Sequence, residues 1–398
     1  MEIANIRTFS VPDRWIIHSY YTLNPYAPDG SGRILCAGCD LSQQTGEVFV
    51  LDRNGKVLDR FGKQSVSAAF FHTGFWQSWG PDGKTVYYQS SNGDPVHPRV
   101  TVRELESGHE TDIEADCEGT PPYGEPFLYG LSGMYYAAGY GDGRYHPEQS
   151  PVLFQNRDQH GLFLASPSTG KRQLLLSVQD ILEKHPLRQE FLEMDARFEG
   201  GLTLMVYCVR FSRDGRQLLF HFGNHCVDTR RGEPRLLSLF TANYSPKDGL
   251  SEVRHALDLN FEQNGVHWSW DNRGGLLGYF GKKGEPMYLA GISRDGRNFH
   301  KISDAKPVGG HPSVSPADPS LIVTDGTFEG QGRVVFLKDG QPVLEKRLPR
   351  CNYENGAILP GRNPYFVCHH PVFNADGSRV LCNILPGKNA QLLEMQLF

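Results

Sequence analysis

The sequence has no run of about 18 consecutive apolar residues, so a membrane-spanning helix is not expected. Positive charge is not in excess: Lys and Arg number 40 against 45 Asp and Glu, which gives a net charge of −5. A nucleic-acid-binding surface is therefore not expected. The N-terminal stretch MEIANIRTFSVPDRW lacks the basic start and apolar centre of a secretory signal. We expect either an intracellular protein or a chain that begins after a cleaved signal.

Cysteine is sparse as well. The 8 cysteines of the 398 residues are too scattered to form a disulfide framework, and reduced thiols are expected. Cys36 and Cys39 form a lone CxxC pair with no second pair, a pattern that does not favour a metal knuckle. Low-complexity linkers are also missing, which favours a single domain over residues 1–398.

The sequence does contain an internal repeat, clearest as HHPVFNADGSRVLCN at residues 369–383. An aromatic or apolar strand leads into an Asp-Gly type of turn, and a second β-rich run follows. Six further copies share this pattern, the most degenerate being the third: residues 24–38, 76–90, 125–140, 208–222, 267–280 and 311–325. The predicted turns contain Asp29, Asp82, Gly133, Asp214, Asn272, Asp318 and Asp376.

Seven copies in this length give roughly 57 residues per repeat, close to the length of a four-stranded propeller blade with long loops. We predict an all-β, seven-bladed β-propeller of four-stranded antiparallel blades, with six or eight blades as the nearest alternatives. All seven turns should lie at one end of the central channel. The C-terminal run at 390–398 should pair with N-terminal strand material. Residues 177–194 have helical spacing interrupted by Pro186, which predicts a helical insertion.

Three histidines occupy the same repeat position: His267, His311 and His370 each precede the strand that leads to the turn. Cys368 lies two residues before His370, so on an extended chain both side chains point to one face. Three imidazoles and a thiolate suit a tetrahedral zinc site, and we predict structural zinc ahead of manganese or calcium. The alternative is that each histidine only caps its strand. His369 should point away and serve the structure.

A second set of polar residues lies in repeats two and three. His72, His97, Tyr140 and Arg157 are the residue types that β-elimination at a uronic acid needs. A cation must neutralise the carboxylate, a base must take the C5 proton, and an acid must protonate the leaving oxygen. His72 and Tyr140 are candidate proton carriers, and Arg157 and His97 are candidate carboxylate partners. Nearby competitors are Tyr145, His146, His160, His221, Asn224 and His225.

At these motifs the chain resembles the β-propeller polysaccharide lyases, which include oligogalacturonide, ulvan and rhamnose–glucuronate lyases. The matching stretches are HWSWD at 267–271, HPSVSPADPSLIVTD at 311–325 and CHHPVFNADGSRVL at 368–381. In oligogalacturonide lyases the stretch that corresponds to residues 368–381 begins with an HxHP motif, whose two histidines bind a metal. Cys368 replaces the first of that pair, so the resemblance favours the ulvan-lyase side, where the metal is a structural zinc. The order His72, His97, Tyr140, Arg157 is similar to the catalytic series of ulvan and rhamnose–glucuronate lyases.

The first hypothesis is therefore a lyase that cleaves an acidic polysaccharide or oligosaccharide at a uronic acid and leaves an unsaturated uronate. Such an enzyme should be a monomer without nucleic-acid or membrane partners. The alternatives are a non-catalytic propeller scaffold for a glycan or protein, and hydrolytic or isomerising chemistry at the metal. The identity of the uronate, endo or exo action and the division of acid and base roles between His72 and Tyr140 stay open.

Overall fold

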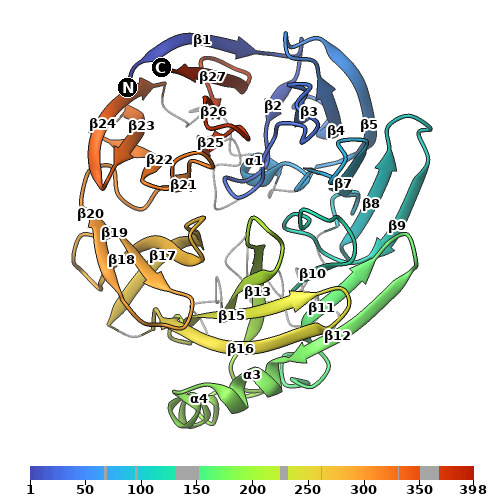
Figure 1. Cartoon of the computed structure of the whole chain (residues 1–398). Coiled ribbons are helices and arrows are strands. Elements are labelled where there is room, and N and C mark those ends of the chain that lie inside the picture. The colour runs from blue at the N-terminus through green and yellow to red at the C-terminus, as the bar shows by residue number, and fades with distance from the viewer. Residues whose placement is uncertain are drawn as a thin grey trace.

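The structure is a computed structural model that describes residues 1–66, 70–94, 97–130, 152–224, 232–260, 262–329, 331–349 and 367–398. Seven antiparallel sheets form a ring about a central axis (Figure 1), which confirms the predicted seven-bladed β-propeller. Within the described residues, blade three has three strands and every other blade has four. None of the helices in this part of the chain has the length and apolar character needed to cross a bilayer.

The first three blades follow one another along the chain. Blade one contains β2 (Trp15–Ile17), β3 (Ile34–Asp40), β4 (Thr45–Leu51) and β5 (Val57–Ser65). Blade two contains β6 (Ser78–Trp79), β7 (Thr85–Gln89), β8 (Arg99–Glu104) and β9 (Glu110–Glu114), and the short helix α1 (Phe70–Thr73) precedes it. Blade three contains β10 (Phe127–Tyr129), β11 (Gly161–Ser166) and β12 (Lys171–Ser177).

The other four blades complete the ring. Blade four contains β13 (Met205–Phe211), β14 (Gln217–Gly223), β15 (Leu237–Ser245) and β16 (Gly249–Asp258). Blade five contains β17 (Gln263–Trp270), β18 (Gly275–Lys282), β19 (Tyr288–Ser293) and β20 (His300–Ser303). Blade six contains β21 (Ser313–Val314), β22 (Leu321–Phe328), β23 (Gln331–Lys338) and β24 (Gln341–Leu348). Blade seven contains β25 (Val372–Phe373), β26 (Arg379–Ile384), β27 (Gln391–Leu397) and β1 (Ile3–Phe9).

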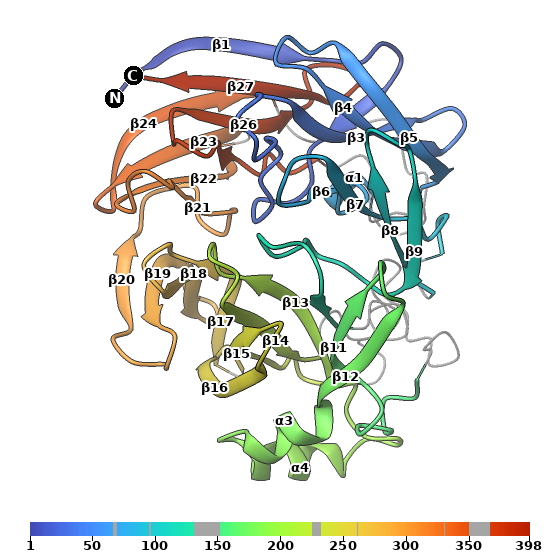
Figure 2. The same ribbon diagram turned by 45° about the vertical axis from the view of Figure 1, so that its right-hand side comes forward.

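The two ends of the chain close the ring together. The N-terminal strand β1 pairs antiparallel with the C-terminal strand β27, as predicted, and the two run side by side in Figure 2. Glu394 on β27 ties this blade to its neighbour: its carboxylate accepts from Arg7 Nε at 3.0 Å and from Tyr26 Oη of blade one at 2.8 Å. Closure by both termini leaves no gap between the first and last repeats.

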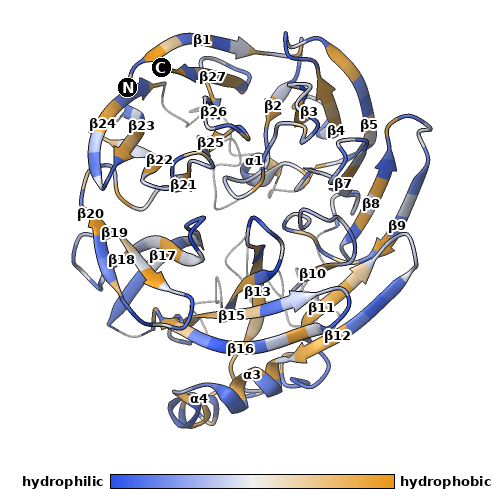
Figure 3. Ribbon diagram, in the orientation of Figure 1, coloured by the Kyte–Doolittle hydropathy of each residue, from blue (hydrophilic) through white to orange (hydrophobic). Residues whose placement is uncertain are grey.

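The sheets are apolar within the ring and polar at its rim. Strands in the middle of a blade, such as β15, are buried along almost their whole length, whereas the outer strand β16 has many exposed positions. Figure 3 shows the corresponding hydrophilic residues along β16 and β12. Burial of the faces between neighbouring blades is therefore what holds the ring together.

The Asp-Gly turns join the innermost strand of a blade to its second strand. In blade seven the Asp376 carboxylate accepts from the Ser378 N–H at 2.8 Å, and Gly377 has a φ of 75°, a conformation that favours glycine. Blade three departs from the sequence prediction. Its equivalent turn is at 121–124, where the Gly124 N–H donates to the Pro121 carbonyl at 2.8 Å. The predicted turn residue Gly133 lies outside the described residues.

The segment expected to be helical contains α3 (Val178–Lys184) and α4 (Arg188–Asp195), which lie on the outside of the ring (Figure 1). Pro186 stands in the break between them. Ser177 and Asp180 cap α3 with reciprocal hydrogen bonds, and Val178, Ile181 and Leu182 are buried. The insertion thus extends the apolar core of blades three and four without entering the centre of the ring.

Candidate functional site

The strands place three histidines at one level of the ring. His267, His311 and His370 each stand three residues before the end of an innermost strand, β17, β21 and β25 respectively. His267 and His370 have positive φ values of 58° and 47°, which are uncommon for residues other than glycine. At His267 the pairing of β17 with β18 shifts register between Val266 and Ser269. Such a bulge re-aims a side chain, and here the side chains meet at the centre of the ring.

The three imidazoles form a continuous cluster. The ring centroids of His267 and His311 are 4.0 Å apart, and those of His311 and His370 are 4.2 Å apart. His72 joins the cluster from α1, with its ring 5.0 Å from that of His370. The nearest ligand atoms of His72, Cys368 and His370 all lie within 4.8 Å of one another. The structure thus joins His267, His311 and His370 ring to ring, and it places Cys368 with His370 and His72. The sequence had placed His72 in a separate catalytic set.

Each of the three strand histidines has a hydrogen-bond partner at its Nδ1 atom. His267 Nδ1 lies 2.8 Å from the Gly310 carbonyl, and His370 Nδ1 lies 3.2 Å from the Ser19 carbonyl. His311 Nδ1 lies 2.9 Å from a carboxylate oxygen of Asp325. Because these oxygens accept, Nδ1 carries the proton in each case and Nε2 holds the lone pair. This is the arrangement that metal-ligating histidines show.

The Nε2 atoms of His311 and His370 provide the test of whether a metal fits. Both atoms are buried, and among the described residues neither has a hydrogen-bond partner. A buried polar atom without a partner costs about 1–3 kcal/mol, so a metal ion that bonded these two nitrogen atoms would relieve that cost. The imidazoles of His72 and His370 and the thiol of Cys368, whose nearest ligand atoms lie within 4.8 Å of one another, are donors suited to a divalent transition metal. The residues present therefore fit a metal ion.

Asp325 holds the cluster in place from behind. Besides His311 Nδ1, its carboxylate accepts from the backbone N–H groups of His311 at 2.7 Å and His370 at 3.0 Å. Burial alone would raise the pKa of Asp325, but electrostatic attraction to the polar His311 ring and the hydrogen bonds from the His311 side chain and backbone outweigh it and lower the pKa well below its usual value. A single ionised carboxylate thus orients two of the histidines.

Two tyrosines beside the cluster were missed in the sequence, and an arginine stands with them. Between β2 and Tyr26 the chain makes an inward excursion, residues 18–25, that places Tyr20 4.8 Å from His370 and Tyr21 5.3 Å from His311, ring to ring. Arg210 Nη1 donates to Tyr21 Oη at 3.0 Å, and burial raises the pKa of both phenols above the usual value. Tyr20 and Tyr21 belong to no repeat copy, and the Tyr-Tyr pair in IIHSYYT was the only signal for this excursion.

The other predicted catalytic residues lie apart from these groups or outside the described part of the chain. Arg157 is buried, and its guanidinium donates to both carboxylate oxygens of Asp195, at 2.5 and 3.2 Å, and to the Leu202 carbonyl at 3.3 Å. The His97 side chain is 67% exposed and pairs with Asp94 at 3.0 Å. Tyr140 lies outside the described residues.

The alternative catalytic candidates also lie either away from the histidine cluster or outside the described residues. His160 is buried 3.3 Å from the Phe154 carbonyl, and Asn224 donates to Glu233 at 3.0 Å. His221 is buried against Tyr207, with ring centroids 5.3 Å apart. The remaining competitors, Tyr145, His146 and His225, lie outside the described residues. His369 turns away from the cluster, as expected, and its Nδ1 lies 2.8 Å from the Asn383 carbonyl.

Comparisons with known proteins show the fold. No family model and no curated protein sequence matches the chain. An oligogalacturonate lyase in complex with manganese superposes with a TM-score of 0.64 at 14% identity, over 100% of this chain and 95% of its own. An oligogalacturonate lyase from Vibrio parahaemolyticus gives 0.65 at 14% identity, over 98% of this chain and 96% of its own.

The fold is also shared with proteins of other activities. A prolyl endopeptidase structure superposes with a TM-score of 0.55 at 11% identity over 96% of this chain, which corresponds to 48% of its own. Propellers thus carry several functions, and the function here must be argued from the site.

Proposed function

We propose that this protein is a lyase that cleaves a glycosidic bond at a uronic acid by β-elimination and releases an unsaturated uronate. The observation that carries the proposal is the buried histidine–cysteine cluster at the centre of the ring, with two inward Nε2 atoms that have no partner among the described residues. The two oligogalacturonate lyases of similar fold support it. We further propose, from the sequence motifs around Cys368, that the protein is more similar in activity to ulvan and rhamnose–glucuronate lyases than to oligogalacturonate lyases.

His267, His311, Cys368 and His370 are the proposed metal ligands. Burial and then the charge of Asp325 raise the pKa of the Cys368 thiol well above its usual value, so the thiolate needs a nearby cation. A thiolate with three imidazoles favours zinc over manganese, which prefers oxygen ligands. When bound, the metal ion would supply positive charge that holds the cluster together and attracts a uronate carboxylate.

The proton steps fall to this chain's own side chains. His72 is half-buried beside Cys368 and His370, and we assign it the proton at C5 of the uronate. Tyr140 keeps the complementary role at the leaving oxygen. Arg157 and His97 stay the proposed carboxylate partners, although Asp195 and Asp94 already engage them. Arg210, 5.5 Å from the Tyr20 ring, adds a fixed positive charge near the cluster. An acidic saccharide needs such charge, because the protein as a whole carries −5.

Two variants and a control separate the catalytic role of His72 from the metal-binding role of the other cluster residues. The assay follows the ultraviolet absorbance of the conjugated product from polygalacturonate, ulvan and gum-arabic-type glycans, together with metal content. His72→Ala should lose about 10²–10⁴-fold in rate with its metal retained. His311→Ala should lose both metal and activity.

His300→Ala is the matched control, because His300 is exposed on β20 and contacts only its own turn at the Asn298 carbonyl among the bonds described. This variant should keep both the reaction rate and the metal content of the wild type. If His72→Ala loses its metal as well, His72 is a ligand and not the base. A scaffold would bind one of these glycans without forming the conjugated product, and hydrolysis would release saturated ends.

A further inference from the structure

A pocket opens at the end of the ring where the Asp-Gly turns lie. It has a volume of 480 Å³, within the range of small-molecule sites. Residues from all seven blades line it, and six of them stand at or beside the turns: Pro28, Pro81, Pro122, Arg213, Pro316 and Ala375. Five of these six carry either a rigid ring or a guanidinium group, so the rim combines fixed shape with charge.

The excursion at residues 18–25 separates this pocket from the histidine cluster. Tyr20 and Tyr21 pack on the histidine rings, whereas the next residues, Thr22, Leu23 and Asn24, line the pocket. One segment therefore forms a wall of both spaces. A ligand in the pocket would face Thr22 and Asn24 and would not touch the histidines.

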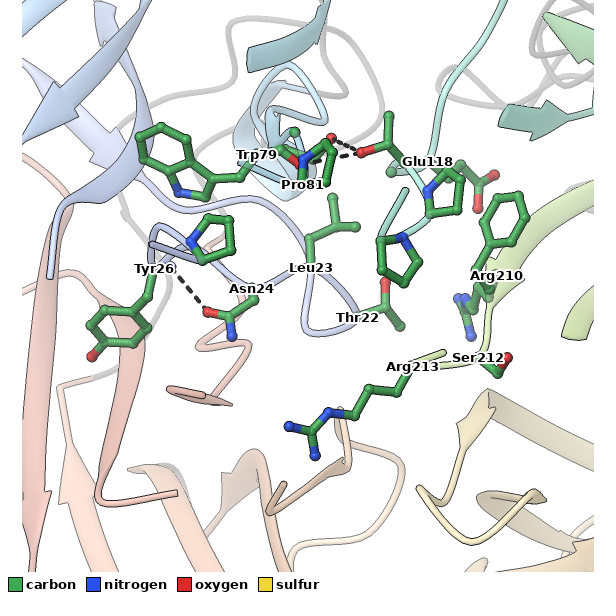
Figure 4. A pocket seen from close by; sticks show the side chains of 18 of the residues that line it. Thr22, Leu23, Asn24, Tyr26, Trp79, Pro81, Glu118, Arg210, Ser212 and Arg213 are labelled. Carbon is green, nitrogen blue, oxygen red and sulfur yellow. Dashed lines mark hydrogen bonds between the residues drawn. The ribbon is translucent and has the colours of Figure 1, made fainter. Parts of the chain in front are cut away.

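The lining contains polar atoms that lack partners among the described residues. Arg210 Nε and Glu118 Oε2 are both buried without a hydrogen bond, and the two residues lie side by side in Figure 4. Arg213 extends across the same space, with Nη1 donating to the Pro316 carbonyl at 3.0 Å. Burial raises the pKa of Glu118 to about 7, so the Arg210 guanidinium lies beside a carboxyl that is only partly ionised near neutral pH.

We propose that this pocket binds a small sugar acid, at a site separate from the histidine cluster. Guanidinium groups bind carboxylates through charge-assisted hydrogen bonds, which Arg213 and the Nε of Arg210 can supply. The hydroxyl groups of Thr22 and Ser269 and the amide of Asn24 suit the hydroxyls of a sugar ring. With a volume of 480 Å³, the pocket suits a monosaccharide and not a whole polysaccharide chain. The inference does not depend on lyase activity.

The test is binding of D-galacturonate, a monosaccharide without a glycosidic bond that β-elimination could cleave, measured by calorimetry on the full chain. Arg213→Ala should weaken the binding about tenfold or more, the worth of one charge-assisted bond. D-galactose, which lacks the carboxylate, should bind more weakly by a similar factor. Arg297→Ala removes an 82% exposed arginine side chain on blade five and should bind like the wild type.

A crystal structure of the wild type with D-galacturonate locates the ligand. The proposal expects the carboxylate within hydrogen-bond distance of Arg213 or Arg210, between Thr22 and Ser212. It is overturned if the ligand is found only at the histidine cluster, if Arg213→Ala binds as tightly as Arg297→Ala, or if the wild type does not bind D-galacturonate. None of these results depends on whether the protein forms unsaturated products.

Discussion

Asp325 and His311 form the pair on which the histidine cluster depends: the carboxylate accepts from the His311 ring at 2.9 Å and from its backbone N–H at 2.7 Å. The same carboxylate accepts from the backbone N–H of His370 at 3.0 Å. Residues behind a metal ligand set the tautomer and direction of the ring. Asp325 therefore acts as a positioning residue for two proposed ligands.

Asp325→Asn tests this relationship. The amide keeps the shape of the side chain but loses the charge, so the Nδ1 proton of His311 is held less firmly. Metal affinity should fall by about 10–100-fold, the usual effect of removing such a partner. Titration with a competing chelator measures it. Asp304→Asn, which removes an exposed acid paired with Lys301, is the control. Unchanged affinity in Asp325→Asn would show that Asp325 has no part in metal binding.

Cys368→Ser tests the choice of metal. Replacing sulfur by a hydroxyl oxygen removes the soft ligand, so zinc affinity should fall by more than manganese affinity. The ratio of the two dissociation constants, compared with that of the wild type, gives the answer. An equal fall for both metals, or no fall, would mean that the thiol does not select zinc.

The propeller could be predicted because each repeat carries its own local signals. The run around Asp376 and Gly377 contains both strands of a hairpin and the turn between them, and such signals act within about 15 residues. Blade three was harder, because Pro121, Pro122 and Tyr123 replace the usual turn residues. The third repeat copy was therefore predicted at residues 125–140, although the turn that follows the innermost segment of this blade is at 121–124.

The site could be predicted only where it follows the repeat. His267, His311 and His370 share one repeat position, and the ring geometry then brings them together. His72 comes from α1, which has no counterpart in the other copies. Its distance from the cluster could therefore not be predicted from the spacing of residues along the sequence. The same holds for Tyr20 and Tyr21. The pairing of Arg157 with Asp195 depends on how the helical insertion folds back on blade three, which is a tertiary relationship.

Arg157→Ala distinguishes a structural role from a catalytic one. Arg157 joins blade three to α4 through Asp195, and the two side chains are 10% and 24% exposed. Loss of the pair should destabilise the fold by about 1–3 kcal/mol, less than for a fully buried pair. Urea unfolding measures this, with the exposed Arg197→Ala as control.

Activity per folded molecule then decides between the roles. A fall of about 10²-fold or more in Arg157→Ala would establish the predicted contact with the substrate carboxylate. Normal activity in the folded fraction would limit Arg157 to holding the insertion.

Glu118→Gln should change the pH dependence of stability. Burial raises the pKa of Glu118 to about 7 from 4.5, so between these values the folded state binds a proton that the unfolded state has lost. Its contribution to stability therefore falls as pH rises through this window. Glutamine keeps the oxygen that accepts from the Cys208 N–H at 3.0 Å.

The variant should match the wild type near pH 5 and exceed it by roughly 1–3 kcal/mol near pH 8. Urea midpoints at the two pH values provide the measurement. A difference that is the same at both would show that Glu118 is not buried as a neutral acid.

The most direct test of the proposed chemistry is the formation of unsaturated uronate by the wild-type protein in metal-loaded and metal-stripped forms. The account predicts that the zinc-loaded protein generates the conjugated absorbance from at least one of polygalacturonate, ulvan or gum-arabic-type glycans. Chelation should abolish the signal, and added zinc should restore it. Absence of the conjugated product from every one of these glycans, with the metal bound and the protein folded, would contradict the account.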